Sequence, residues 1–229
     1  MQGIELVILD CDGVLVDSEI VAARAEAELL TGVGYAIEPE ELAERFAGLT
    51  TKDMLLAVEE EAGIPLQASL LERMREATDR RLAREVKAIE GAREAIARLR
   101  LPCCVCSNSR TERIELMLNR TGLLPLVAGR IFSASASEEI RPKPAPDVFL
   151  HAAREMKVEP ARCMVVEDSR HGVAAARAAG MRVIGFTGAS HAWPGLADLL
   201  TETGAETVIG RWSDFGPVLE ALSDWSPIE

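Results

Sequence analysis

Aromatic residues are scarce in this chain. Phe, Trp and Tyr make up only 4% of the 229 residues, whereas hydrophobic residues as a whole make up 48%. The core must therefore consist mainly of aliphatic side chains and alanine, which suits close packing of helices against a sheet. At this length we expect one large domain, or a core domain with an insertion.

Basic residues are also few relative to acidic ones. The chain has 25 Lys and Arg against 37 Asp and Glu, which gives a formal net charge of -12. Binding to a nucleic-acid backbone requires a surface rich in Lys and Arg, so we expect no nucleic-acid partner. An anionic substrate would have to meet local positive charge in this acidic protein, which makes individual Lys and Arg residues near a site informative.

Long apolar runs and a disulfide framework are absent as well. No segment reaches the ~18 consecutive apolar residues of a membrane span, and the start of the chain lacks the basic flank of a signal peptide. We therefore expect a cytoplasmic protein without a membrane partner. The five cysteines are odd in number and lie mostly in strand-like runs, which predicts reduced core thiols. Cys103 and Cys106 have C-x-x-C spacing, but their extended, apolar surroundings do not favour a redox or zinc site.

The start of the chain combines an apolar strand with two acids. Residues 4–9 form a short run rich in β-branched residues, and Asp10 and Asp12 follow it directly. The pattern predicts a buried parallel strand, and open α/β sheets bind ligands at the carboxyl ends of such strands. Side chains two residues apart leave an extended chain on the same side, and Gly13 allows the backbone to turn. Two carboxylates there suit a nucleophile with a proton shuttle, or a hard cation; an ordinary Asp-Gly turn is the structural alternative.

The rest of the chain divides into a helical insertion and a strand-helix alternation. Residues 19–30, 40–46, 52–62 and 67–83 have helical patterns with no convincing strand between them, which predicts a small bundle. Strands are predicted at 101–106, 130–134, 163–166, 183–186 and 207–209, with helices between them. This alternation predicts an α/β fold with a doubly wound, Rossmann-like parallel sheet. The expected domains are a core of residues 1–17 and 88–229 and an inserted helical cap of residues 18–87.

Polar side chains follow the other predicted strands too. Ser107 and Asn108 follow the second strand, Lys143 lies beyond the third, and Glu167 and Asp168 follow the fourth. Each has a structural alternative: a helix cap for the serine and the acids, and a solvated loop charge for the lysine. Their joint appearance in complementary chemical types, at ends that meet on one rim of the sheet, favours a functional site.

These motifs resemble those of the haloacid dehalogenase superfamily. The matching residues are Asp10-Cys11-Asp12-Gly13-Val14, Ser107-Asn108, Lys143-Pro144 and Glu167-Asp168-Ser169. The likeness spans nearly the whole chain, including the helical insertion, which resembles the cap of that family. Within the superfamily, residues 12–19 and 143–147 are similar to the β-phosphoglucomutase and phosphoglycolate phosphatase group.

The resemblance implies a phosphoryl-transfer mechanism. Asp10 would attack phosphorus and Asp12 would act as general acid and base, in agreement with the chemistry expected of two such carboxylates. Lys143, Ser107 and Asn108 would bind the phosphate. The implied cofactor is Mg²⁺, held by Asp10, the backbone carbonyl of Asp12, and Asp168, with Glu167 as a neighbour or further ligand.

The helical cap is expected to select the substrate. Arg45, Thr51 and Lys52 lie in or near the loop of residues 46–53 and are the candidate specificity residues. The expected partner is a small phosphorylated metabolite, such as a sugar or sugar-acid phosphate, and the expected oligomeric state is a monomer.

The function that the resemblance implies is a Mg²⁺-dependent phosphatase, which hydrolyses a small phosphate ester through an aspartyl-phosphate intermediate. Two other functions remain as alternatives. One is a phosphosugar mutase of the β-phosphoglucomutase type; members of that group carry a histidine on the first cap helix, where this chain has Ala22. The other is a non-catalytic protein that keeps only the fold. Asp12 argues against dehalogenases and phosphonatases, which lack this second acid.

Overall fold

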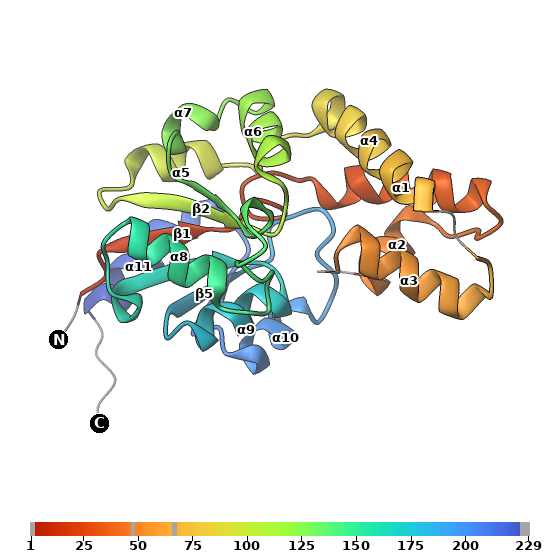
Figure 1. The fold of residues 1–229 in the computed structure, drawn as a ribbon. Helices are drawn as coiled ribbons and strands as arrows, with labels where there is room; N and C mark the ends of the chain where they lie inside the picture. The colour runs from red at the N-terminus through yellow and green to blue at the C-terminus, as the bar shows by residue number, and fades with distance from the viewer. Residues whose placement is uncertain (1–2, 47–48, 66–67, 225–229) are drawn as a thin grey trace.

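A parallel sheet forms the centre of the larger part of the molecule (Figure 1). The computed structural model describes residues 3–46, 49–65 and 68–224. Within them the sheet has six strands, in the order β3-β2-β1-β4-β5-β6, and every neighbouring pair is parallel. The strands are β1 (Leu6–Leu9), β2 (Cys103–Ser107), β3 (Ile131–Ser133), β4 (Cys163–Glu167), β5 (Arg182–Phe186) and β6 (Thr207–Ile209). The predicted fold class is confirmed, and β1 lies at the point where the strand order reverses.

Both faces of the sheet are covered by helices. Val7 and Leu9 of β1 point into one hydrophobic cluster, and Leu6 and Ile8 point into the other. All four residues of β1 are buried, which explains why its sequence is continuously apolar and does not alternate. The first cluster includes residues of α5 (Ala92–Arg98), α6 (Thr111–Arg120), α7 (Leu124–Val127) and α11 (Trp212–Asp224), and the second includes residues of α8 (Asp147–Glu155), α9 (Arg170–Ala178) and α10 (Leu196–Thr203).

The helical insertion has a separate hydrophobic cluster. Its helices are α1 (Glu19–Gly32), α2 (Pro39–Arg45), α3 (Thr51–Ala62) and α4 (Ala68–Glu85). Leu30, Val58 and Met74, from three of these helices, are completely buried in the cluster. Figure 1 shows the four helices beside the carboxyl edge of the sheet and joined to it only near α1 and α4. This arrangement agrees with a core and a cap, while the boundaries at residues 17 and 87 stay a prediction.

Two passages of backbone join the cap to the core, and they lie side by side. The Asp17 amide donates to the Lys87 carbonyl oxygen at 2.9 Å, and the Ile89 amide donates to the Leu15 carbonyl oxygen at 2.9 Å. An antiparallel bridge between Val16 and Ala88 lies between these bonds. The two passages therefore form a short hydrogen-bonded ribbon at the junction of cap and core.

Several local details differ from the sequence predictions. The helix expected from residue 40 begins at Pro39, because proline at the first helical position needs no amide partner. The short helix α7 was not predicted, because its four residues show no helical period. Residues 134–136 and 160–162 form single 3₁₀ turns. Ala47, Gly48 and Gln67, which fall in predicted elements of the cap, lie outside the described residues.

The cysteines and the helix hydropathy agree with the predictions made from composition. All five cysteines are buried free thiols, and Cys103 and Cys106 both belong to the extended strand β2. Within the described ranges, every helix is too short or too polar to cross a membrane.

Candidate active site

Lys143 is the buried cation at the centre of the site. Its Nζ donates to Asp10 Oδ1 at 2.5 Å, to Glu167 Oε1 at 2.5 Å and to the Cys106 carbonyl oxygen at 2.9 Å. Its side chain is 5% exposed, and the ammonium group lies 4.9 Å from the centre of the Phe149 ring. Burial alone lowers the pKa of Lys143, but the two carboxylates outweigh it and raise the pKa above its usual value. The ammonium group is therefore charged at neutral pH.

Asn108 holds Lys143 in place. The Lys143 amide donates to Asn108 Oδ1 at 2.8 Å, and Asn108 Nδ2 donates to the Lys143 carbonyl oxygen at 3.3 Å. Asn108 follows β2 directly, so these two bonds attach the long loop after β3 to the rim of the sheet. The sequence assigned Asn108 to phosphate binding; in the structure its side chain is engaged with the backbone of Lys143.

Three acids lie close enough together to hold a metal ion. Asp10, Glu167 and Asp168 are all buried, and one carboxylate oxygen from each lies within 4.8 Å of the others. The sequence predicted these three side chains as part of the metal site. It assigned only the backbone carbonyl of Asp12 to the metal, and the Asp12 side chain indeed points to a different set of partners.

Two glycines make room for these carboxylates. A Cβ atom at Gly13 would lie 1.8 Å from Asp168 Oδ2, and one at Gly172 would lie 1.9 Å from the carboxyl group of Glu167. Gly13 also has a φ of 75°, in the left-handed region that favours glycine. Any other residue at either position would displace an acid from the cluster.

The charges of the site are unbalanced, and this fits a hard divalent cation. Burial raises the pKa of Asp10; Lys143 opposes the effect, and Glu167 and Asp168 add to it. Among the residues that the structure describes, none donates a hydrogen bond to Asp10 Oδ2 or Asp168 Oδ1. Oxygen donors with excess negative charge are the ligands that Mg²⁺ prefers. Both oxygens of Glu167 already accept hydrogen bonds, one from Lys143 and the other from Ser169, so Glu167 is the least available of the three acids.

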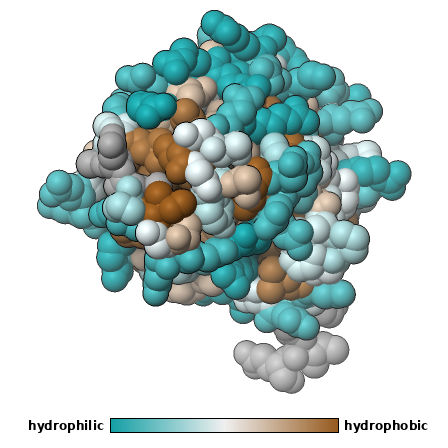
Figure 2. Space-filling model, turned by 90° about the vertical axis from the view of Figure 1, so that its right-hand side faces the viewer, coloured by the Kyte–Doolittle hydropathy of each residue, from teal (hydrophilic) through white to brown (hydrophobic). Residues whose placement is uncertain are grey.

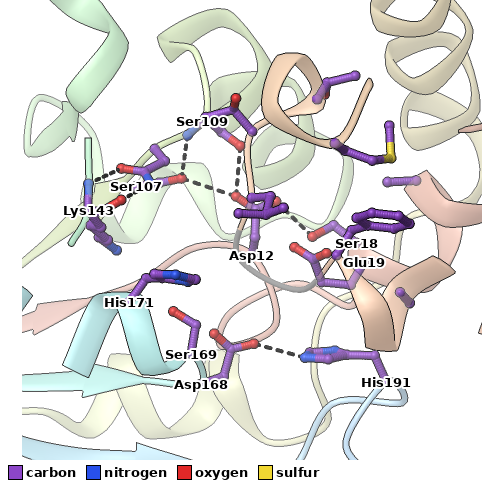
Figure 3. Close-up of a pocket in the computed structure, with 18 of the residues that line it drawn as sticks. Asp12, Ser18, Glu19, Ser107, Ser109, Lys143, Asp168, Ser169, His171 and His191 are labelled. Carbon is purple, nitrogen blue, oxygen red and sulfur yellow. Dashed lines mark hydrogen bonds and ion pairs between the residues drawn. The ribbon is translucent and has the colours of Figure 1, made fainter. Parts of the chain in front are cut away.

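Asp12 accepts hydrogen bonds from three hydroxyl groups (Figure 3). Ser18 Oγ donates to Asp12 Oδ1 at 2.7 Å, while Ser107 Oγ and Ser109 Oγ donate to Oδ2 at 3.1 and 2.9 Å. Ser18 directly precedes α1, the first helix of the cap. Ser18 occupies the cap position, but its hydroxyl bonds to Asp12 and makes no capping bond. Ser107 also lies at the rim, as predicted, with its oxygen accepting from the Ser109 amide at 2.9 Å.

The structure adds a histidine and an acid that sequence reasoning did not assign to the site. His191 Nε2 lies 3.1 Å from Asp168 Oδ2, and this bond raises the pKa of His191 to about 9 although burial lowers it. Glu19 lies nearby on α1, and burial raises its pKa to about 7. The position of Ser190-His191 just beyond the end of β5 was the available signal for the histidine, since polar residues at strand ends had already located the other groups.

A cavity of about 590 Å³ extends from the acids to the cap. Arg45, Thr51 and Lys52, the predicted specificity residues, all line it. Arg45 forms ion pairs with Glu41 and Glu61, at 2.9 and 2.5 Å. Lys52 is exposed and forms no ion pair with any described residue. The cap end of the molecule is otherwise mostly hydrophilic with small apolar patches, as Figure 2 shows.

Fold and site together define a Rossmann-like α/β enzyme with a helical cap and an acidic, lysine-centred site on the sheet rim. Residues 4–180 match the model of the haloacid dehalogenase-like hydrolases, and the chain belongs to this family. It is 33% identical over 195 residues to the 6-phosphogluconate phosphatase of Escherichia coli (strain K12), covering 85% of this chain and 87% of the relative. The predicted family and the prediction of a phosphatase are confirmed.

Solved structures show the same fold. A haloacid dehalogenase-like protein of unknown function from Agrobacterium tumefaciens is 55% identical, with a TM-score of 0.89 and coverage of 97% of this chain and 100% of that one. A family hydrolase from Deinococcus radiodurans R1, solved with bound phosphate and sodium, is 30% identical, with a TM-score of 0.79 and coverage of 97% and 98%.

Proposed function

We propose that the chain is a Mg²⁺-dependent phosphomonoesterase that hydrolyses a small phosphate ester, of a sugar or sugar acid, through a phosphorylated Asp10. The observation that carries the proposal is the surroundings of Asp10. One of its oxygens is bound by the Lys143 ammonium group, the other accepts no hydrogen bond from any described residue, and a second acid, Asp12, lies two residues away. The phosphatase named among the relatives and the phosphate bound in the Deinococcus structure support the same class of substrate.

Asp10 is the proposed nucleophile. Its Oδ2 forms a bond to phosphorus while the bond from phosphorus to the ester oxygen breaks, and Lys143 holds the carboxylate in position through Oδ1. A carboxylate that approaches a phosphate dianion is repelled by it, so positive charge is required nearby. Asp10 and Asp168 would hold Mg²⁺, which would supply this positive charge.

Asp12 is the proposed general acid and base. In the first step it gives its proton to the leaving ester oxygen. In the second it takes a proton from the water whose oxygen bonds to phosphorus while the bond between phosphorus and Asp10 Oδ2 breaks, which releases inorganic phosphate and frees Asp10. Three hydroxyl groups, of Ser18, Ser107 and Ser109, donate hydrogen bonds to its carboxyl oxygens. Ser18, one of these three donors, directly precedes α1, the first helix of the cap. Closure of the cap would therefore change the hydrogen bonds to Asp12.

Hydrolysis is tested with p-nitrophenyl phosphate and a panel of sugar and sugar-acid phosphates. Release of inorganic phosphate should require Mg²⁺, should stop after exhaustive chelation with EDTA, and should return when Mg²⁺ is restored. Undiminished turnover in EDTA would reject the metal-dependent route. Absence of turnover with every ester, in folded protein saturated with Mg²⁺, would favour the non-catalytic alternative.

The mutase alternative is tested separately. Ala22 lines the cavity on α1, and its methyl group can neither give nor take a proton. We therefore propose that water, and not a second sugar hydroxyl, accepts the phosphoryl group. Conversion of β-glucose 1-phosphate to glucose 6-phosphate that outpaces phosphate release from every ester would overturn this assignment.

A further inference from the structure

His191 is in direct contact with one of the acids of the metal site. Its Nε2 lies 3.1 Å from Asp168 Oδ2, and the side chains of the two residues are 11% and 8% exposed (Figure 3). The bond occupies one oxygen of Asp168, while among the described residues nothing donates to the other. An imidazole N–H that binds one oxygen of a carboxylate fixes the rotation of the carboxyl group, and so it also fixes where the second oxygen points.

Close packing restricts the alternatives open to this pair. A Cβ atom built on Gly13 would lie 1.8 Å from Asp168 Oδ2 and 2.8 Å from His191 Cε1. The backbone at Gly13 therefore lies directly against both side chains. It leaves Asp168 little space to turn away from His191 without a movement of the loop that follows β1.

The loop that carries His191 is bound to the ribbon between core and cap. Asp17 Oδ1 accepts hydrogen bonds from the Ser190 amide at 3.1 Å and from Ser190 Oγ at 2.8 Å. Asp17 also donates its own amide to the Lys87 carbonyl oxygen on the returning passage. Two consecutive residues thus connect the ribbon to the acid cluster: Ser190 contacts the ribbon and His191 contacts Asp168.

We propose that His191 is a positioning residue that orients Asp168 for the metal ion, and that the Asp17–Ser190 contact links this orientation to the hinge of the cap. The inference rests on the proposed function, because it assigns Asp168 to a metal site. It predicts that metal affinity depends on two residues that do not touch the metal. Outer contacts of this kind typically change metal affinity by about 10- to 100-fold.

The test is the affinity of the substrate-free protein for Mg²⁺, measured by titration calorimetry, with kcat measured separately at saturating Mg²⁺. H191F removes the N–H donor with a ring of similar size and should weaken Mg²⁺ binding by about 10-fold or more. H191Q should recover most of the affinity, because its amide nitrogen reaches roughly the place of Nε2. H151F is the matched control. His151, on α8, packs edge-on against Phe132 of β3 and does not line the cavity, so the Mg²⁺ affinity of H151F should equal that of the unmodified chain.

The hinge link is tested by D17A and by the double variant D17A/H191F. D17A should weaken Mg²⁺ binding by a few fold, and the double variant should lose less than the product of the two single losses. Wild-type affinity in folded H191F, or in D17A should H191F fail to fold, would overturn the inference. That result, with Mg²⁺-dependent hydrolysis intact in the unmodified chain, would leave the proposed function standing. Failure of the unmodified chain to bind Mg²⁺ or to hydrolyse any ester would overturn both.

Discussion

The sheet rim and the inner face of the cap line the same cavity, yet their charged groups differ in kind. At the rim, Lys143 and Glu167 have side chains that are 5% and 0% exposed and are joined at 2.5 Å. In the cap, Arg45 is 37% exposed and its partners Glu41 and Glu61 are more exposed still. Buried charges interact strongly because little water screens them, whereas exposed ion pairs contribute about 0–1 kcal/mol.

This difference separates the proposed chemistry from the proposed selection of substrate. The rim residues come from four strand ends and hold each other in one arrangement, so a single substitution there removes both geometry and charge. The cap residues lie on helices outside the sheet, and the ion pairs they form are exposed and therefore weak. Substitutions at the rim should therefore affect every substrate, and substitutions in the cap should affect some substrates and not others.

The largest expected effect is that of D10N. Asn keeps the shape of the side chain but removes the proposed nucleophile and a proposed metal ligand, so kcat should fall by about 10³-fold or more. The measurement is phosphate release from p-nitrophenyl phosphate, with the fold checked by circular dichroism. D214N, at a half-buried residue of α11 that does not line the cavity, is a control that should leave kcat unchanged. More than a few per cent of the original kcat, with deamidation of the Asn excluded, would reject Asp10 as nucleophile.

K143M should affect both activity and stability. Removing the ammonium leaves Asp10 and Glu167 buried without their cation, and loss of one partner of a buried ion pair costs about 3–5 kcal/mol. The free energy of unfolding, measured with urea, should fall by an amount in that range at neutral pH, and kcat should fall at least 100-fold. K157M, at an exposed lysine, is the matched control. A stability of K143M equal to that of K157M would show that Lys143 does not balance the acids.

The cap predictions are smaller and depend on the substrate. Thr51 is the first residue of α3, and the neighbouring Thr50 caps the helix by accepting the Asp53 amide at 3.2 Å. T51A therefore leaves the N-cap hydrogen bond of α3 in place and tests only the Thr51 side chain in the cavity. T51A, K52A and R45A should each change kcat/KM by about 10-fold for some esters of a metabolite panel and leave p-nitrophenyl phosphate nearly unchanged. If no ester in the panel responds, this loop does not select substrates.

The last expected effect is confined to stability and comes from Glu26, a cavity residue of α1. Burial raises its pKa to about 7, although Arg113 nearby lowers it, so the folded protein binds this proton more tightly than the unfolded chain. By linkage, the contribution of Glu26 to stability is full below its unfolded pKa of about 4.5 and is lost as the pH rises to about 7.

E26Q, which cannot ionise, isolates this contribution. Its free energy of unfolding should match that of the unmodified chain near pH 4.5 and exceed it by up to about 3 kcal/mol above pH 7. Urea unfolding of both proteins across pH 4.5–8 measures the difference. A difference that does not change with pH would contradict the raised pKa.

The sequence by itself determined the parallel sheet, the helical insertion and the acids and lysine of the rim. These features are readable because each depends on neighbours in the chain: an apolar run specifies a buried strand, and the polar residues that end it reach the rim wherever the strand is placed. The resemblance to a known family added the roles of Asp10, Asp12 and Asp168, which local pattern alone left open.

Only the tertiary structure decided which side chains touch. The Ser18 hydroxyl binds Asp12 and does not cap its helix, and Asn108 binds the backbone of Lys143. His191 contacts Asp168 from a loop that follows a different strand. These contacts join residues up to 35 positions apart, and each depends on how far a side chain extends and which rotamer the surrounding packing allows. The periodicity and spacing of residues in the sequence do not predict these contacts, because the energy that decides them comes from atoms brought together only by folding.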